Sequence, residues 1–120
     1  MKTILVIDDE PEFIETVRMR LEAGGYRVIG ALDGDKGVRR ARQEKPGLIL
    51  LDLMMPNVDG FQALYQLKKD NSVKSIPVII ITARSETDYI LDTGKLGAVD
   101  YIVKPVNMHE LIKLVAKHIA

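Results

Sequence analysis

Three acidic residues in a row, Asp8, Asp9 and Glu10, directly follow an aliphatic run at residues 4–7. Adjacent like charges repel one another, and apolar neighbours make the ionisation of a carboxyl group costly. A strand end seldom needs this much negative charge for stability. The cluster therefore predicts a positively charged partner at this point of the fold.

Three further apolar runs also end in residues that could take part in chemistry. Asp52 ends the run LILLD, Thr82 ends VIIIT, and Lys104 ends YIVK and is followed by Pro105. A carboxylate, a hydroxyl and an ammonium group at strand ends can meet if the strands lie side by side and point the same way.

The order of the segments predicts how these residues are positioned. Five short apolar runs recur at residues 3–7, 27–31, 48–51, 78–81 and 101–103. The first, third and fourth runs are continuous rather than alternating, which is typical of strands that are covered on both faces in a parallel sheet.

Segments with helical spacing separate the runs. Apolar residues three to four apart predict a helix opened by Pro11 and closed by Gly24, another after Gly60, and a third near the end of the chain. Weaker patterns at 35–44 and 86–96 each contain a helix-disfavouring glycine. Together they complete five strand–helix pairs.

Five strand–helix pairs predict an α/β fold, doubly wound and flavodoxin-like, with a five-stranded parallel sheet covered by helices on both faces. The common strand order of such a sheet is 2-1-3-4-5, which places the first and third strands side by side at the switch point. Ligands bind beyond the carboxyl ends of the strands there. We therefore expect the polar residues at the strand ends to converge on one pocket.

The charges of such a pocket suggest its chemistry. The carboxylates of Asp8, Asp9 and Asp52 cannot all stay ionised without a cation, and an oxygen-only ligand set with few protein donors suits hydrated Mg²⁺. Lys104 and Thr82 supply the donors that a metal-bound phosphoryl group needs. Three carboxylates, one Mg²⁺ and one ammonium sum to zero charge, so an arriving phosphoryl group meets no net repulsion. An aspartate can then attack phosphorus and form an acyl phosphate.

The composition limits the other functions of the chain. Its length predicts a single domain over residues 1–120, and its 17 basic and 17 acidic residues give no electrostatic case for nucleic acid as a partner of this domain. The absence of cysteine excludes disulfides, zinc–thiolate sites and a cysteine nucleophile. No apolar run approaches the roughly 18 residues of a membrane span, and the N-terminus lacks a signal-peptide pattern. We therefore expect a cytoplasmic protein that does not contact membranes.

At this point the residues resemble the receiver domain of two-component response regulators, of the kind found in chemotaxis receivers. The resemblance covers essentially the whole chain. Its landmarks follow in order, each at a predicted strand end: VIDDE at 6–10, LLDLMMPNVDG at 50–60, PVIIITA at 77–83 and GAVDYIVKP at 97–105. The resemblance implies a phosphorylated switch rather than an enzyme.

The resemblance implies roles for the acidic positions. Asp52 matches the phosphoacceptor. Asp9 and Asp52 match direct Mg²⁺ ligands, the backbone carbonyl of Met54 matches a third ligand, and Asp8 matches a ligand that acts through water.

The resemblance also implies which residues bind the phosphoryl group and which ones switch. Lys104 matches the lysine that pairs with the phosphoryl group or with Asp52. Thr82 matches the hydroxyl that moves toward the phosphoryl oxygens, and Ala83 beside it is implied in phosphoryl binding. Tyr101 matches the aromatic residue that turns inward when Thr82 moves.

Three positions are implied to set the geometry of the surrounding loops: Pro56, Gly60 and Pro105. In the family, the peptide bond before the last of these prolines is usually cis. A cis Lys104–Pro105 bond would aim Lys104 into the site.

The implied partners are other proteins. A histidine kinase or a histidine phosphotransfer protein would present phosphohistidine, and Asp52 would attack phosphorus while Mg²⁺ and Lys104 neutralise the oxygens. The face made by the fourth helix, fifth strand and fifth helix would then shift its population of states and control an output domain or target protein. The chain would be a monomer or a phosphorylation-dependent dimer.

Three other functions fit parts of the pattern. An aspartyl-phosphate phosphatase usually has a second acid two residues after the nucleophile, where this chain has Met54. A flavodoxin-like cofactor binder needs a Gly-, Ser- or Thr-rich loop after the first strand, where this chain has acids. A phosphate-independent, receiver-like interaction module needs none of the polar residues, and it is the main alternative.

Some of the residues also have a purely structural interpretation. The acids after the first strand could cap the helix that follows them. Arg39, Arg40 and Arg42 are predicted to form a solvated helix face, and His109 and His118 of the last helix are predicted to face solvent.

Overall fold

The computed structural model describes residues 1–53, 60–83 and 94–120. In these residues, five parallel strands form one sheet in the order β2-β1-β3-β4-β5. The predicted fold class and strand order are confirmed, and each strand boundary lies within one residue of its predicted place. The strands are β1 (Thr3–Ile7), β2 (Arg27–Ala31), β3 (Leu48–Asp52), β4 (Val78–Thr82) and β5 (Asp100–Val103).

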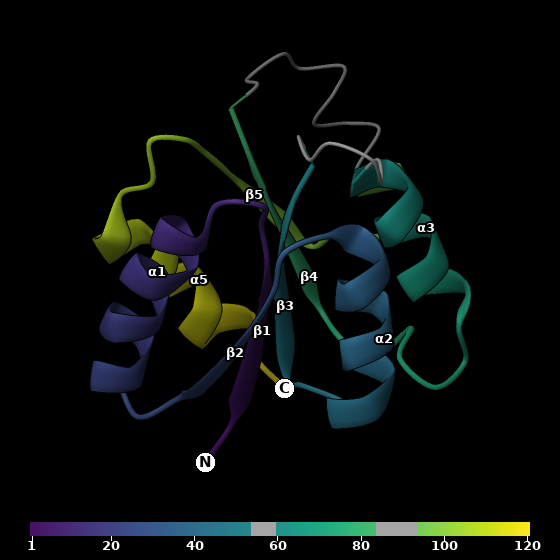
Figure 1. Cartoon of the computed structure of the whole chain (residues 1–120), viewed down its shortest axis with the longest axis horizontal. Coiled ribbons are helices and arrows are strands. Elements are labelled where there is room, and N and C mark those ends of the chain that lie inside the picture. Colours follow the sequence, from purple (N-terminus) through teal and green to yellow (C-terminus); the bar gives the residue numbers. More distant parts are fainter. Residues whose placement is uncertain (54–59, 84–93) are drawn as a thin grey trace.

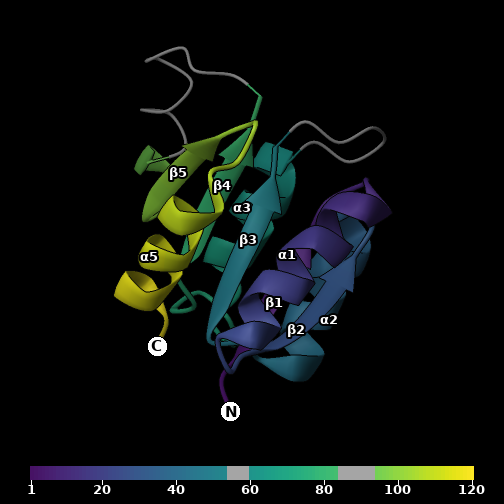
Figure 2. The same cartoon turned by 90° about the vertical axis from the view of Figure 1, so that its left-hand side faces the viewer.

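The helices cover the sheet in two layers. Helices α1 and α5 pack on one face of the sheet and α2 and α3 on the other (Figure 1), and the perpendicular view shows α1 and α5 side by side in front of the strands (Figure 2). The helices are α1 (Pro11–Ala23), α2 (Gly34–Glu44), α3 (Gly60–Lys69) and α5 (Met108–His118). The helix predicted at 86–96 falls largely outside the described residues.

Two apolar cores lie on the two faces of the sheet. We call the core under α1 and α5 the α1/α5 core and the core under α2 and α3 the α2/α3 core. Successive residues of β1, β3 and β4 alternate between them, so that both faces of these strands are buried. This arrangement explains the continuous apolar runs of the central strands, because each residue faces a helix layer whichever way it points.

Helix α2 shows why a glycine stands inside a helix. A Cβ atom added at Gly37 would lie 2.4 Å from Cδ1 of Ile7 in β1. The glycine therefore lets α2 approach the sheet closely. The gain in packing offsets the low helix propensity that weakened the sequence-based prediction.

Two expectations about surface residues are wrong in part. Arg40 donates from Nη1 to the carbonyl of Gly30 at 2.7 Å, and Arg42 pairs with Asp70, so these arginines join elements rather than only face solvent. His118 lies 3.1 Å from Oδ2 of Asp100, and its side chain is 19% exposed. These contacts reach across 10, 28 and 18 residues of sequence. Helical periodicity cannot indicate contacts of this kind, because it reports only on one element at a time.

The described helices also bear on membrane contact. None of those in residues 1–53, 60–83 and 94–120 is long and apolar enough to cross a membrane.

Candidate functional site

Side-chain alternation along the strands places three of the candidate residues on the same face of the sheet. In β1 and β3, the residues that pack into the α1/α5 core stand at every second position, and Ile102 of β5 packs into the same core. One more step of this alternation leads to Asp8, Asp52 and Lys104. The backbone pairing continues this far, since the amide of Asp8 donates to Ala31 at 3.0 Å and that of Lys104 donates to Thr82 at 2.7 Å.

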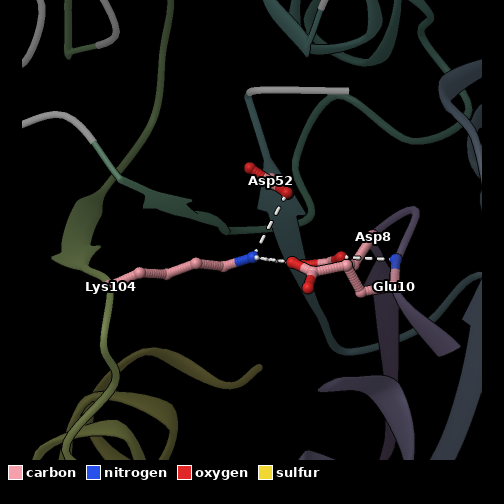
Figure 3. A network of polar contacts seen from close by, with 4 residues as sticks. All are labelled: Asp8, Glu10, Asp52 and Lys104. Atoms are coloured by element: carbon pink, nitrogen blue, oxygen red, sulfur yellow. Dashed lines mark hydrogen bonds and ion pairs between the residues drawn. The ribbon is translucent and has the colours of Figure 1, made fainter. Parts of the chain in front are cut away.

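The ammonium of Lys104 is the positive partner of the acids in this structure. Its Nζ lies 3.0 Å from Oδ2 of Asp8, 3.1 Å from Oε1 of Glu10 and 3.4 Å from Oδ2 of Asp52 (Figure 3). Asp8 and Asp52 are 1% and 3% exposed, so the inner part of this network is withdrawn from water. The predicted convergence of Asp8, Asp52 and Lys104 is what the structure displays.

The acids after β1 are held by more than helix capping. Asp8 accepts a hydrogen bond from the backbone amide of Glu10 at 2.8 Å, while Glu10 makes no side-chain cap on α1. The interpretation of the acids as plain helix caps is therefore wrong for Glu10, whose carboxylate is turned toward Lys104 instead.

The acidic residues also form a possible metal site. Asp8, Asp9, Glu10 and Asp52 each offer a carboxylate oxygen, and these four atoms lie within 4.8 Å of one another. A set of oxygen ligands of this kind suits a hard cation such as Mg²⁺. The residues present therefore fit the cation that the sequence predicts, although Met54 lies outside the described residues.

The electrostatics of the site are those of four clustered carboxyl groups with one ammonium group, that of Lys104, in contact with three of them. Burial raises the pKa of Asp8 to about 6, and the charge of Asp52 acts in the same direction, while the amide of Glu10 and the ammonium of Lys104 act against it. Burial by itself lowers the pKa of Lys104, but its hydrogen bonds to Asp8 and Glu10 and the charge of Asp52 outweigh this and raise the pKa above its ordinary value. Lys104 is thus firmly charged, and a further cation would ease the ionisation of Asp8.

The hydroxyl and aromatic residues lie on the neighbouring strands. Thr82 ends β4 with 1% of its surface exposed, and it stands opposite Val103, directly before Lys104. Tyr101 in β5 is 40% exposed in this structure. Ala83 follows β4 and is exposed. This placement suits the expected roles of these residues in binding and switching, which stay predictions.

The expected loop residues have different outcomes. The Lys104–Pro105 peptide bond is cis, as expected. Gly60 begins α3 so close to β3 that an added Cβ would lie 2.3 Å from the Cα of Leu53. Pro56 lies outside the described residues.

Sequence reasoning missed two neighbours of Lys104. The first is Glu10, because the acidic run places it beside Asp8 and Asp9 but does not indicate a contact with the lysine. The second is Phe13, whose ring centroid lies 4.5 Å from Nζ of Lys104. The position of Phe13 in the helical pattern of apolar residues indicates only that it lies on the apolar side of α1. No signal in the sequence distinguishes a ring that faces a cation from a ring that faces the core.

A groove opens beside the site. It has a volume of about 520 Å³ and runs between the start of α1 and the start of α5. Its lining residues are Glu10, Phe13, Lys104, Pro105, Val106 and Met108.

Comparison with known proteins places these features in a family. The family model for the response regulator receiver domain matches residues 4–116. The chain therefore belongs to the response regulator receiver domain family of two-component systems.

Particular relatives agree with this assignment. The chain is 43% identical to the protein PilH of Pseudomonas aeruginosa over 116 residues, which cover 96% of this chain and 95% of PilH. It is 41% identical to the transcriptional regulator RpaA of Synechocystis over 93% of this chain but 46% of RpaA. The chain thus spans nearly all of one relative and less than half of the other.

Solved structures share the fold over the whole chain. The chemotaxis protein CheY4 of Vibrio cholerae superposes with a TM-score of 0.93 at 25% identity, with 99% of each chain covered. The receiver domain of the sensor histidine kinase PA1611 of Pseudomonas aeruginosa, whose structure has a magnesium ion coordinated in the active site cleft, gives a TM-score of 0.88 at 27% identity. The match covers 98% of this chain and 96% of that domain.

Proposed function

We propose that this receiver domain accepts a phosphoryl group from phosphohistidine onto Asp52 and uses it to change the surface offered to an output partner. In this reaction the phosphorus–nitrogen bond of the donor breaks and a bond forms between phosphorus and a carboxylate oxygen of Asp52. The donor would be a histidine kinase or a histidine phosphotransfer protein.

One observation carries this proposal. A nearly buried carboxylate, Asp52, shares the ammonium of Lys104 with a second buried carboxylate, Asp8. A buried network of this kind costs free energy through desolvation, and a purely structural core would be as stable with apolar residues. The network is accounted for if Asp52 reacts and Lys104 neutralises the oxygens of the incoming group.

A divalent cation would complete the site. The carboxylates of Asp8, Asp9 and Asp52 would hold Mg²⁺, directly or through water, and the family resemblance adds the carbonyl of Met54. Bound there, the cation would offset the repulsion between the carboxylates and the negatively charged phosphoryl group. Lys104 would bind a phosphoryl oxygen through its ammonium group.

The switch would start at Thr82. We propose that its hydroxyl and the adjacent Ala83 bind phosphoryl oxygens, and that Tyr101 turns inward from its exposed position when Thr82 moves. The face of the fourth helix, β5 and α5 would then shift toward the arrangement that its output partner binds. The domain would act as a cytoplasmic switch with at most self-catalysed phosphotransfer and dephosphorylation, either as a monomer or as a phosphorylation-dependent dimer. It would not bind nucleic acid by itself.

Intact-mass spectrometry tests the proposal directly. After incubation with acetyl phosphate and Mg²⁺, we expect one added phosphoryl group that hydroxylamine removes. EDTA and the variant Asp52→Asn should both abolish the adduct. An adduct that persists in Asp52→Asn would place the acceptor elsewhere.

The main alternative is a receiver-shaped interaction module that never takes phosphate. If no adduct forms although Mg²⁺ binds, a beryllofluoride titration separates a short-lived phosphoryl state from this alternative. Beryllofluoride imitates an acyl phosphate and should change the spectrum of the phosphate-responsive protein but not that of the module.

A further inference from the structure

The ammonium of Lys104 has neighbours on two sides. On the inner side are the buried carboxylates of Asp8 and Asp52, at 3.0 and 3.4 Å. On the outer side are the carboxylate of Glu10 at 3.1 Å and the ring of Phe13, with its centroid at 4.5 Å. Glu10 is mostly in water, since its side chain is 61% exposed. The lysine thus has two sets of partners that differ in burial.

The inner partners are also the residues that would hold a cation. Asp8 and Asp52 belong to the cluster of oxygen ligands, and the ammonium now contacts both. A divalent cation and the ammonium cannot both draw fully on these carboxylates, because like charges repel at short range. Binding of the cation therefore requires the ammonium to give up part of its inner contacts.

The structure has room on the outer side. The groove of about 520 Å³ beside the site is lined by Glu10, Phe13 and Lys104 itself. Lysine has a flexible stem and three rotatable donors, so its head can shift while the backbone of β5 stays in place.

We propose that Glu10 and Phe13 form an outer holding position for the Lys104 ammonium, which the lysine uses when a divalent cation occupies the acidic cluster. They are positioning residues, because they act on the site through the lysine. The inference rests on the proposed function for its metal, but it concerns Glu10, directly before α1, and Phe13 in α1, to which that function assigns no part.

The two outer partners are chemically suited to this task. Glu10 supplies a counter-charge, so the ammonium need not shift into water unpaired. The ring face of Phe13 attracts a cation without requiring one hydrogen-bond geometry, so the ammonium can take several positions over the ring. When a cation neutralises the inner carboxylates, these two residues are the remaining partners of the ammonium in the part of the chain that the structure describes, and their contribution becomes larger than in the metal-free protein.

The test is a double-mutant cycle on Mg²⁺ affinity, measured by isothermal titration calorimetry. Phe13→Leu should weaken Mg²⁺ binding by about two- to five-fold, the range expected for loss of one partly exposed cation–ring contact. Lys104→Met should strengthen binding, because it removes the competing ammonium. In the Lys104→Met background, Phe13→Leu should change the affinity by less than about 1.5-fold, because the ring then has no cation to hold.

Matched controls separate this effect from a loss of packing. Phe13→Tyr keeps the aromatic face and should bind Mg²⁺ like the unmodified chain. Tyr65 on α3 holds Lys69 in a similar contact, with the ammonium 4.8 Å from the ring centroid. Tyr65→Leu therefore loses an equivalent pair away from the acidic cluster and should leave Mg²⁺ affinity unchanged. Thermal unfolding checks that each variant is folded.

Nuclear magnetic resonance gives a readout that packing alone does not move. The methylene protons of Lys104 next to Nζ should carry a ring-current shift from Phe13 that grows on addition of Mg²⁺. The shift should vanish in Phe13→Leu and persist in Phe13→Tyr.

Three results would overturn the proposal. If Phe13→Leu changes the Mg²⁺ affinity equally in the unmodified chain and in the Lys104→Met background, the ring supports the fold and not the lysine. If Glu10→Gln weakens Mg²⁺ binding equally in the unmodified chain and in the Lys104→Met background, Glu10 is a metal ligand instead of a partner of the lysine. If the unmodified chain binds no Mg²⁺, the metal step of the proposed function fails as well, and this result is distinct from the other two.

Discussion

Asp8 illustrates at the scale of one residue how a site can oppose stability. Its carboxyl group is 1% exposed, and burial raises its pKa to about 6 from an ordinary value of 3.8. A raised pKa in the folded state means that the protonated form is favoured there. The metal-free protein is therefore stabilised by protonated Asp8 below pH 3.8, and this stabilisation is lost as the pH rises through about 6.

This shift predicts a pH-dependent effect of Asp8→Asn. An asparagine cannot ionise, so the variant should gain stability relative to the unmodified chain as the pH rises from 4 to 7 in the absence of metal. A shift of about two pKa units limits the gain to about 3 kcal/mol. Urea unfolding at several pH values, with EDTA present, measures the difference in the free energy of unfolding.

An exposed carboxylate provides the control. Asp35 is exposed in the first turn of α2, where the helix dipole favours a carboxylate, so Asp35→Asn should not gain stability as the pH rises from 4 to 7. A difference between Asp8→Asn and the unmodified chain that stays constant from pH 4 to 7 would contradict the prediction. With Mg²⁺ at pH 7, the unmodified chain should be more stable than Asp8→Asn, because the ionised carboxylate of Asp8 is then a ligand of the cation.

At the scale of elements, the start of α3 lies so close to the end of β3 that there is no space for a side chain at Gly60. A Cβ at Gly60 would lie 2.3 Å from the Cα of Leu53 and 2.9 Å from the carbonyl oxygen of Asp52. These are backbone atoms, which cannot rotate away as a flexible side chain can. The position of Asp52 is thus coupled to a glycine in the next element.

Gly60→Ala should therefore destabilise the fold and disturb the site together. Overpacking against a backbone costs about 1–3 kcal/mol or more, and Mg²⁺ affinity should fall because Asp52 is displaced. Gly94→Ala is the matched control, since a Cβ there meets no atom of residues 1–53, 60–83 and 94–120 within 4 Å. Denaturant unfolding and Mg²⁺ titration of both variants measure the two effects, and equal stability of the two variants would refute the explanation.

The elements and the main site residues could be predicted because each depends on a local pattern. Continuous apolar runs give buried strands, and the residues that end them must meet at one edge of a parallel sheet. The outer partners of Lys104 could not be predicted in this way. Glu10 and Lys104 are 94 residues apart, and their contact depends on where a flexible side chain settles in the finished fold. The pairing of His118 with Asp100 escaped prediction for the same reason.

At the scale of the whole molecule, one sheet is shared by two cores. Strands β1, β3 and β4 contribute side chains to both the α1/α5 core and the α2/α3 core. Neither helix layer can separate without exposing one face of these strands to water. We therefore expect the two cores to unfold in one cooperative transition, as is usual for a domain of this size.

The acidic cluster lies at the edge of this shared sheet, so a bound cation should stabilise both cores equally. Free Mg²⁺ at ten times its dissociation constant should add about 1.4 kcal/mol and raise the Tm by about 5 °C. Methyl signals of Val38, in the α2/α3 core, and Val115, in the α1/α5 core, report the two halves separately during thermal unfolding. On addition of Mg²⁺, the unfolding midpoints reported by the two methyl signals should rise to the same higher temperature. Asp9→Asn should reduce this rise, while Asp70→Asn, which lies outside the acidic cluster, should not. A rise of the midpoint at Val115 but not at Val38 would instead mean that the cation stabilises only the layer of α1 and α5, and that the sheet does not couple the two layers.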